Sequence, residues 1–161
     1  MSVNLTLSFA DEIHSALVRG AEAEGFEPSG FAVRIVEDYL LNKDGLLDAQ
    51  AKADILLGRS LIQQAVDRAM AIVATEGFRS SITFDAIQAV SEDASWLADY
   101  RTLVRDDPYK TGNPRKQTIN QNLGYFIKKA VGAKSMTKSD NKAVNVKVKG
   151  SIIQSYTPLE L

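Results

Sequence analysis

The sequence predicts a mainly α-helical protein with a short β-strand near its start and a β-hairpin near its end. Residues 3–9 alternate strictly between apolar and polar side chains, which is the period of a half-buried strand. Between residues 10 and 131, apolar residues recur at the spacing of amphipathic helices. Residues 144–149 then alternate again, now valine with asparagine or lysine. We therefore expect helices to supply most of the core.

Composition limits the classes of protein to which this chain can belong. Its 161 residues are 45% hydrophobic and 24% charged, as in an ordinary globular protein. Cysteine is absent and His14 is the only histidine, so we expect no disulfide, no metal site and no cofactor. We find neither a signal peptide nor a run near the roughly 18 apolar residues that cross a membrane. These features predict a soluble, cytoplasmic protein with no membrane partner.

Charge is divided unevenly along the chain. Residues 1–100 contain 7 Lys and Arg against 16 Asp and Glu, a difference of −9. Residues 101–161 contain 12 Lys and Arg against 4 Asp and Glu, a difference of +8. This split either reflects ordinary solvated surface or marks a module near the C-terminus that binds a polyanion such as DNA.

The predicted strand at residues 3–9 has no partner nearby, because a helical pattern follows it directly. An unpaired strand exposes its backbone hydrogen-bonding groups, so it must pair with something. The simplest partner is the same strand of a second copy, which predicts a homodimer. One face of the strand would carry Val3, Leu5, Leu7 and Phe9, and the other Asn4, Thr6 and Ser8.

Two helices are expected next, over residues 10–24 and 28–42. Gly25 is suited to a left-handed cap after the first helix, and Pro28 suits the first turn of the second. A strand and two helices enclose little core, so these elements again favour two intertwined copies. The turn residues 42–45 predict a boundary between a first domain, residues 1–43, and a second, residues 44–161.

The order of these elements resembles the ribbon-helix-helix family of DNA-binding repressors. The resemblance covers residues 2–42, through the alternating strand, the helix with Ile13 and Leu17, and the segment 29–40. It implies that paired strands lie in the DNA major groove and read base edges through Asn4, Thr6 and Ser8. The alternative is that these three side chains form only the solvated face of a dimerisation strand.

The second domain is expected to be α+β. The sequence predicts a long helix to Glu76, a short strand over residues 78–83, and helices over residues 84–91 and 94–105. Trp96 is expected to pack in the core. A loop over residues 107–115 would lead into a further helix over residues 117–131, with a buried stripe of Ile119, Leu123, Phe126, Ile127 and Ala130.

The last helix and the hairpin carry the remaining candidate DNA contacts. Residues 144–149 would form one strand of the hairpin, residues 152–156 the other, and Gly150-Ser151 the two-residue turn. The element order resembles a winged-helix domain, whose hairpin lies against the DNA backbone. The candidate contacts in this part are Arg115, Gln117, Gln121, Lys128, Lys147 and Lys149.

These features predict a dimeric, sequence-specific DNA-binding protein, a transcriptional regulator of the repressor type. Two alternatives remain open: a protein-interaction module such as an antitoxin, and an accessory factor in plasmid or phage DNA handling. We expect no enzymatic activity, because the sequence contains no Gly-rich phosphate loop, nucleophile elbow or paired-histidine metal motif.

Overall fold

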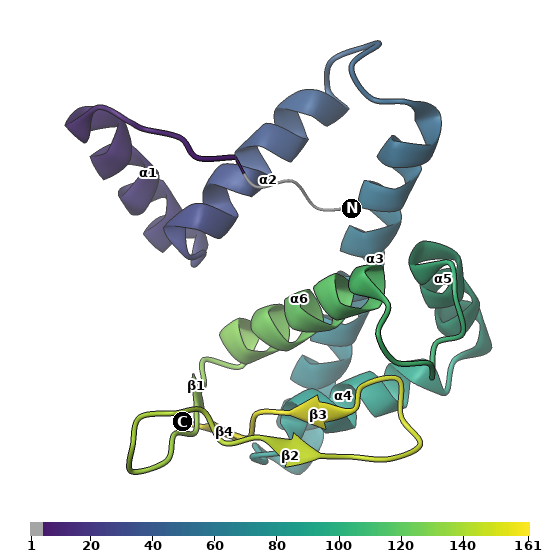
Figure 1. Ribbon diagram of the computed structural model, residues 1–161. Helices are drawn as coiled ribbons and strands as arrows, with labels where there is room; N and C mark the ends of the chain where they lie inside the picture. Colours follow the sequence, from purple (N-terminus) through teal and green to yellow (C-terminus); the bar gives the residue numbers. More distant parts are fainter. Residues whose placement is uncertain (1–4) are drawn as a thin grey trace. The chain divides into compact units, whose positions relative to one another are not determined.

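The computed structural model describes residues 5–161 (Figure 1). Over these residues the chain is mainly helical, with six α-helices and two antiparallel sheets of two strands each. The chain divides into two compact units, the first ending at Ala53 and the second spanning Asp54–Leu161. This division lies inside helix α3 (Ala49–Glu76). The six helices confirm the prediction of a mainly helical fold.

The first unit contains the two expected helices, α1 (Asp11–Glu24) and α2 (Pro28–Leu41). Gly25 ends α1 in the left-handed conformation, with φ of 65°, and Pro28 occupies the first turn of α2, both as predicted. The two helices approach closely at Gly20, where a Cβ atom would lie 2.6 Å from Cε1 of Phe31. Glycine at this position therefore makes room for the Phe31 ring.

Little of the first unit is buried in a single copy. Ala21 is the only buried residue of α1, and α2 has none. Residues 5–10 form neither helix nor strand, so the described part of the predicted strand 3–9 is unpaired within one chain. A lone segment has no neighbour for its backbone groups, and the strand stays a prediction that needs a second copy. Nine large apolar side chains of this unit are exposed: Leu5, Leu7, Phe9, Ile13, Val33, Ile35, Val36, Tyr39 and Leu46.

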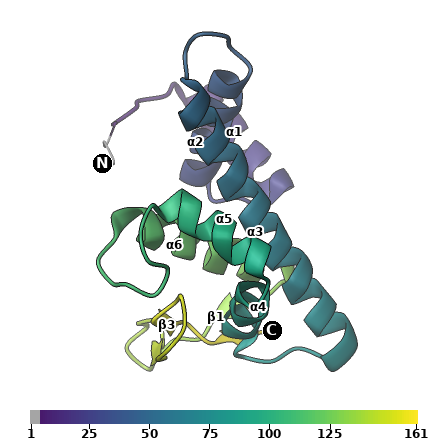
Figure 2. The ribbon, with the colours of Figure 1, turned by 90° about the vertical axis from the view of Figure 1, so that its right-hand side faces the viewer.

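The second unit is built on the C-terminal part of α3. Helices α4 (Ile82–Ser91), α5 (Ala94–Val104) and α6 (Pro114–Ala130) gather around it (Figure 2). The prediction of a strand over residues 78–83 was wrong, since α4 already begins at Ile82. The Ser80 carbonyl of this segment accepts a hydrogen bond from the Leu159 N–H at 2.9 Å.

The core of this unit is formed by side chains from all four helices and from the C-terminal segment. Trp96 is 1% exposed, which confirms its predicted role in packing. Its ring stacks on Tyr100 with centroids 5.3 Å apart, and its indole N–H donates to the Leu61 carbonyl at 3.3 Å. Trp96 therefore fixes α5 against α3.

The C-terminal segment closes the core with two short strand pairs. Strand β1 (Lys134–Ser135) pairs with β4 (Leu159–Glu160), and the sequence had predicted neither of these two strands. Strand β2 (Val146–Lys147) pairs with β3 (Ser155–Tyr156). The hairpin is therefore confirmed in outline, although its strands are shorter than expected.

The predicted two-residue turn at Gly150-Ser151 was wrong. Lys147 pairs with Ser155, so residues 148–154 form a longer connection. Ile152 and Ile153 of this connection are both buried in the core. Neighbouring residues of a strand point to opposite faces, so burial of both differs from the pattern of a hairpin strand with one solvated face.

Candidate functional site

Helix α6 is held at its start by Asn113. The Asn113 side-chain oxygen caps the helix by accepting from the backbone N–H groups of Arg115 and Lys116, at 2.9 and 3.1 Å. Its amide nitrogen donates to the Val104 carbonyl at the end of α5, at 3.0 Å. Asn113 thus ties the first turn of α6 to α5.

The predicted inner stripe of α6 is confirmed at its centre. Ile119, Leu123 and Ile127 are buried, while Phe126 and Ala130 are only half-buried. The stripe also includes Lys116, three residues before Ile119, which had not been predicted as part of the site. Its helical spacing from Ile119 was the signal in the sequence that could have placed it on this face.

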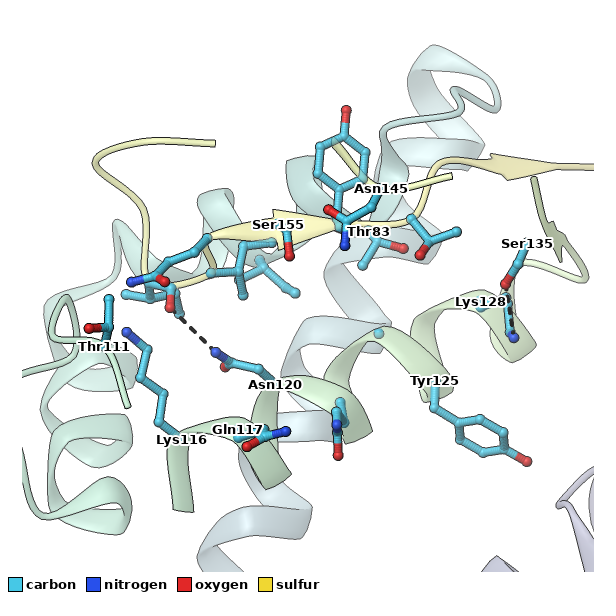
Figure 3. A pocket seen from close by; sticks show the side chains of 18 of the residues that line it. Thr83, Thr111, Lys116, Gln117, Asn120, Tyr125, Lys128, Ser135, Asn145 and Ser155 are labelled. Atoms are coloured by element: carbon cyan, nitrogen blue, oxygen red, sulfur yellow. Dashed lines mark hydrogen bonds between the residues drawn. The ribbon is translucent and has the colours of Figure 1, made fainter. Parts of the chain in front are cut away.

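A cavity of about 600 Å³ lies between α6 and the C-terminal segment, and we call it the α6 groove (Figure 3). Amide and hydroxyl side chains dominate its walls. Lys116 and Lys128 are the charged residues among those described that line it, and both are cationic. The groove is lined by Thr83, Ile87, Thr111, Gly112, Asn113, Lys116, Gln117, Asn120, Gln121, Gly124, Tyr125, Lys128, Ser135, Asn145, Ile152, Ile153, Gln154, Ser155, Tyr156, Thr157 and Leu159.

Lys116 is the more enclosed of the two cations. It is 6% exposed, and its Nζ donates to the Lys110 carbonyl at 2.8 Å. Burial lowers the pKa of Lys116, and the negative charges of Asp107 and Asp106 oppose this shift. An ammonium group has three N–H donors, and the Lys110 carbonyl engages one of them. In Figure 3 the ammonium group points toward Thr111 at one end of the groove.

The centre of the groove is set by a hydrogen-bonded chain through Asn120. Tyr100 is fully buried, and its hydroxyl donates to Oδ1 of Asn120 at 2.7 Å. Nδ2 of Asn120 in turn donates to the Ile152 carbonyl at 3.4 Å. Burial raises the pKa of Tyr100, so its hydroxyl remains a donor at neutral pH. This chain links α5, α6 and the C-terminal segment.

The opposite end of the groove is formed by Lys128. Its Nζ donates to Oγ of Ser135 in β1, at 3.3 Å. Figure 3 shows this pair at the far end of α6 from Lys116, while the Tyr125 ring points away from the strands. The two cations therefore lie at opposite ends of a groove whose middle is neutral and polar.

The structure brings several predicted site residues together. Gln117 and Gln121 are exposed and line the groove with Lys128, while Lys147 and Lys149 are exposed beside it, on and after β2. The predicted alternation around β2 is confirmed, because Val144, Val146 and Val148 are half-buried and their neighbours are exposed.

Arg115 has a partner that the sequence did not reveal. Its guanidinium lies 3.1 Å from Oδ2 of Asp54, which also contacts Arg105 at 2.8 Å. In the described structure, Arg115 therefore joins α6 to α3 and is not an unpaired cation beside the groove.

The strand residues of the first unit are described only in part. Thr6 and Ser8 are exposed, and Asn4 lies outside the described residues.

Over residues 5–161, no three His, Asp or Glu side chains are grouped so that they could share a metal ion. None of the helices in this range is both long and apolar enough to cross a membrane. Comparisons with protein-family models, with curated proteins and with solved structures found no match.

Proposed function

We propose that this chain is a dimeric, sequence-specific DNA-binding protein that acts as a transcriptional regulator. The observation that carries this proposal is the exposed polar surface formed by Gln117, Gln121, Lys147 and Lys149 in the second unit. Glutamine on a helix can pair with base edges in the major groove, and lysine neutralises phosphates. Helix α6 would read the bases, and the β2–β3 hairpin would contact the backbone.

The charge of the two hairpin lysines supports this proposal. Lys147 and Lys149 are exposed, and neither forms an ion pair within the described residues. By contrast, Lys110 and Lys142 pair with Asp106 and Asp140, at 3.5 and 3.1 Å. The hairpin lysines thus have no carboxylate partner among the described residues, and they are accessible to a polyanion.

Dimerisation is supported by the first unit. Nine large apolar side chains among its described residues stay exposed to water in one copy. Exposed apolar side chains in this number are typical of an interface, and pairing of two copies would also give the predicted strand at residues 3–9 a partner. A twofold dimer presents two equivalent DNA-binding surfaces, so the preferred site would have two related half-sites.

The test is selection of binding sites from random duplexes by the purified protein, followed by mobility shift at several salt concentrations. We expect recovered sites with twofold symmetry, and an affinity that falls steeply with salt. The double variant Lys147→Gln/Lys149→Gln should weaken binding to all duplexes, whereas Gln121→Ala should relax sequence preference. Arg68→Gln, at an exposed position of α3, is the matched charge control. Absence of binding to any duplex at low salt would overturn the proposal.

A second candidate function is capture of a different protein through the first unit. The same exposed apolar side chains favour it, since such a surface can be covered by a foreign chain as well as by a second copy. A stable one-to-one complex with another protein, together with a monomeric free state, would favour this function over the first.

A further inference from the structure

We propose that the α6 groove is a binding site for a phosphate ester of mononucleotide size. This inference goes beyond the proposed contact with duplex DNA, because it concerns a small ligand inside the groove, although Gln117 and Gln121 belong both to the groove and to the surface proposed to read bases. It does not require that the chain bind duplex DNA.

The size of the groove fits a small ligand. Its volume of about 600 Å³ falls within the range of roughly 300–1,000 Å³ typical of small-molecule sites. Two elements far apart in sequence form its walls, α6 on one side and residues 145–157 on the other. A ligand bound here would contact both walls at once.

The charge of the groove selects an anion. Lys116 and Lys128 line it, and none of the described lining residues is acidic. Both ammonium groups are already oriented, by the Lys110 carbonyl and by the Ser135 hydroxyl. Each still has N–H donors beyond these single bonds, and phosphate oxygens accept such bonds strongly. Ordered cations of this kind lose little side-chain freedom when an anion binds.

The neutral part of the groove suits the rest of a nucleotide. Gln117, Asn145 and Gln154 carry amides that both donate and accept, and Ser155 adds a hydroxyl. Asn120 is held between Tyr100 and the Ile152 carbonyl, which fixes a further amide in the middle of the groove. Amides of this kind pair with the edges of an unpaired base or with sugar hydroxyls. A simple apolar ligand would leave them without partners.

The first experiment is a titration of the full chain with adenosine 5′-monophosphate, inorganic phosphate and a single-stranded tetranucleotide, followed by NMR of backbone amides. Gly112 and Gly124 line the groove, whereas Gly77 and Gly132 do not. We expect the monophosphate to shift the Gly112 and Gly124 signals and to leave those of Gly77 and Gly132 in place. If the tetranucleotide produces these shifts and the monophosphate does not, the phosphate ester that binds the groove is part of a nucleic-acid strand.

Variants then locate the site. Lys128→Gln should weaken binding of the monophosphate by about tenfold or more, because a charge-assisted hydrogen bond is lost. Gln154→Ala on the opposite wall should also weaken it; the Gln154 backbone carbonyl that accepts from Val148 stays in place. Lys138→Gln removes the same charge at an exposed position outside the groove, so it should leave binding of the monophosphate unchanged. Fluorescence of Trp96 verifies that each variant is folded.

The outcomes separate this inference from the proposed function. Failure of all three probes to bind overturns the groove site, as does equal binding by the Lys128→Gln variant. Binding of inorganic phosphate as tight as that of the monophosphate overturns the assignment to an ester. None of these results affects duplex binding through Lys147 and Lys149, which the mobility shift tests by itself.

Discussion

Substitution of Val36 by aspartate tests whether a second copy covers the first unit. Val36 lies on α2 and is 50% exposed in a single copy. Burying a half-exposed side chain of this size gains about 1 kcal/mol, so nine such residues in each of two copies gain roughly 18 kcal/mol. This gain exceeds the cost of association, which is about 4–15 kcal/mol. With a cost near the middle of this range the net gain is roughly 8 kcal/mol, so the wild-type chain should dimerise with a dissociation constant of about 1 μM.

The aspartate would be buried at the interface without a partner in both copies. Each unpaired charge costs at least about 2 kcal/mol, so the dimer should dissociate about a thousandfold more readily. Sedimentation velocity over a range of concentrations measures this change. Met70→Asp is the matched control, because Met70 is 45% exposed but belongs to the second unit. A monomeric wild-type chain, or a Val36→Asp variant that dimerises like it, would refute the reasoning.

Three further predictions concern the second unit, and urea unfolding followed by Trp96 fluorescence measures each. Tyr100→Phe should lower the free energy of unfolding by about 1–2 kcal/mol, because Asn120 loses its donor; an unchanged value would contradict the hydrogen bond. Gly124→Ala should raise the free energy of unfolding by about 0.5–1 kcal/mol, because alanine favours a helix interior and the new Cβ would lie at an ordinary contact distance of 3.8 Å from Thr83. A lower free energy of unfolding would mean that the methyl group does not fit. Asp93 caps α5, and its hydrogen bonds with Ser95 and Trp96 hold its pKa below the ordinary value of 3.8. The stability that this cap contributes to the folded state is therefore present above this pH and lost on acidification. Asp93→Asn should keep the cap without this pH dependence, and a parallel pH profile in both proteins would contradict the assignment.

Local patterns in the sequence were sufficient to predict the helices. The boundaries of α1 and α2 follow from Gly25 and Pro28, which act on the backbone of their immediate neighbours. The inner stripe of α6 follows from the spacing of Ile119, Leu123 and Ile127. Each of these features depends on residues within a few positions of one another.

The elements that sequence reasoning missed depend on distant partners. Strand β1 exists because Lys134 and Ser135 pair with Glu160 and Leu159, and two residues carry no period of their own. The same holds for the candidate site. Gln117 and Gln121 could be placed on the outer face of α6, but Asn145, Gln154 and Ser155 join them only because the C-terminal segment packs beside α6.

The closure of the core by Ile152, Ile153 and Leu159 has a consequence for synthesis of the protein. The helices that these residues cover all leave the ribosome first, since α6 ends at Ala130. Until residue 159 has emerged, the apolar side chains of the nascent second unit stay open to water and to chaperones. Ribosomes stalled before this point should therefore hold a chain that proteases cut readily, and ribosomes stalled well beyond it should hold a resistant one.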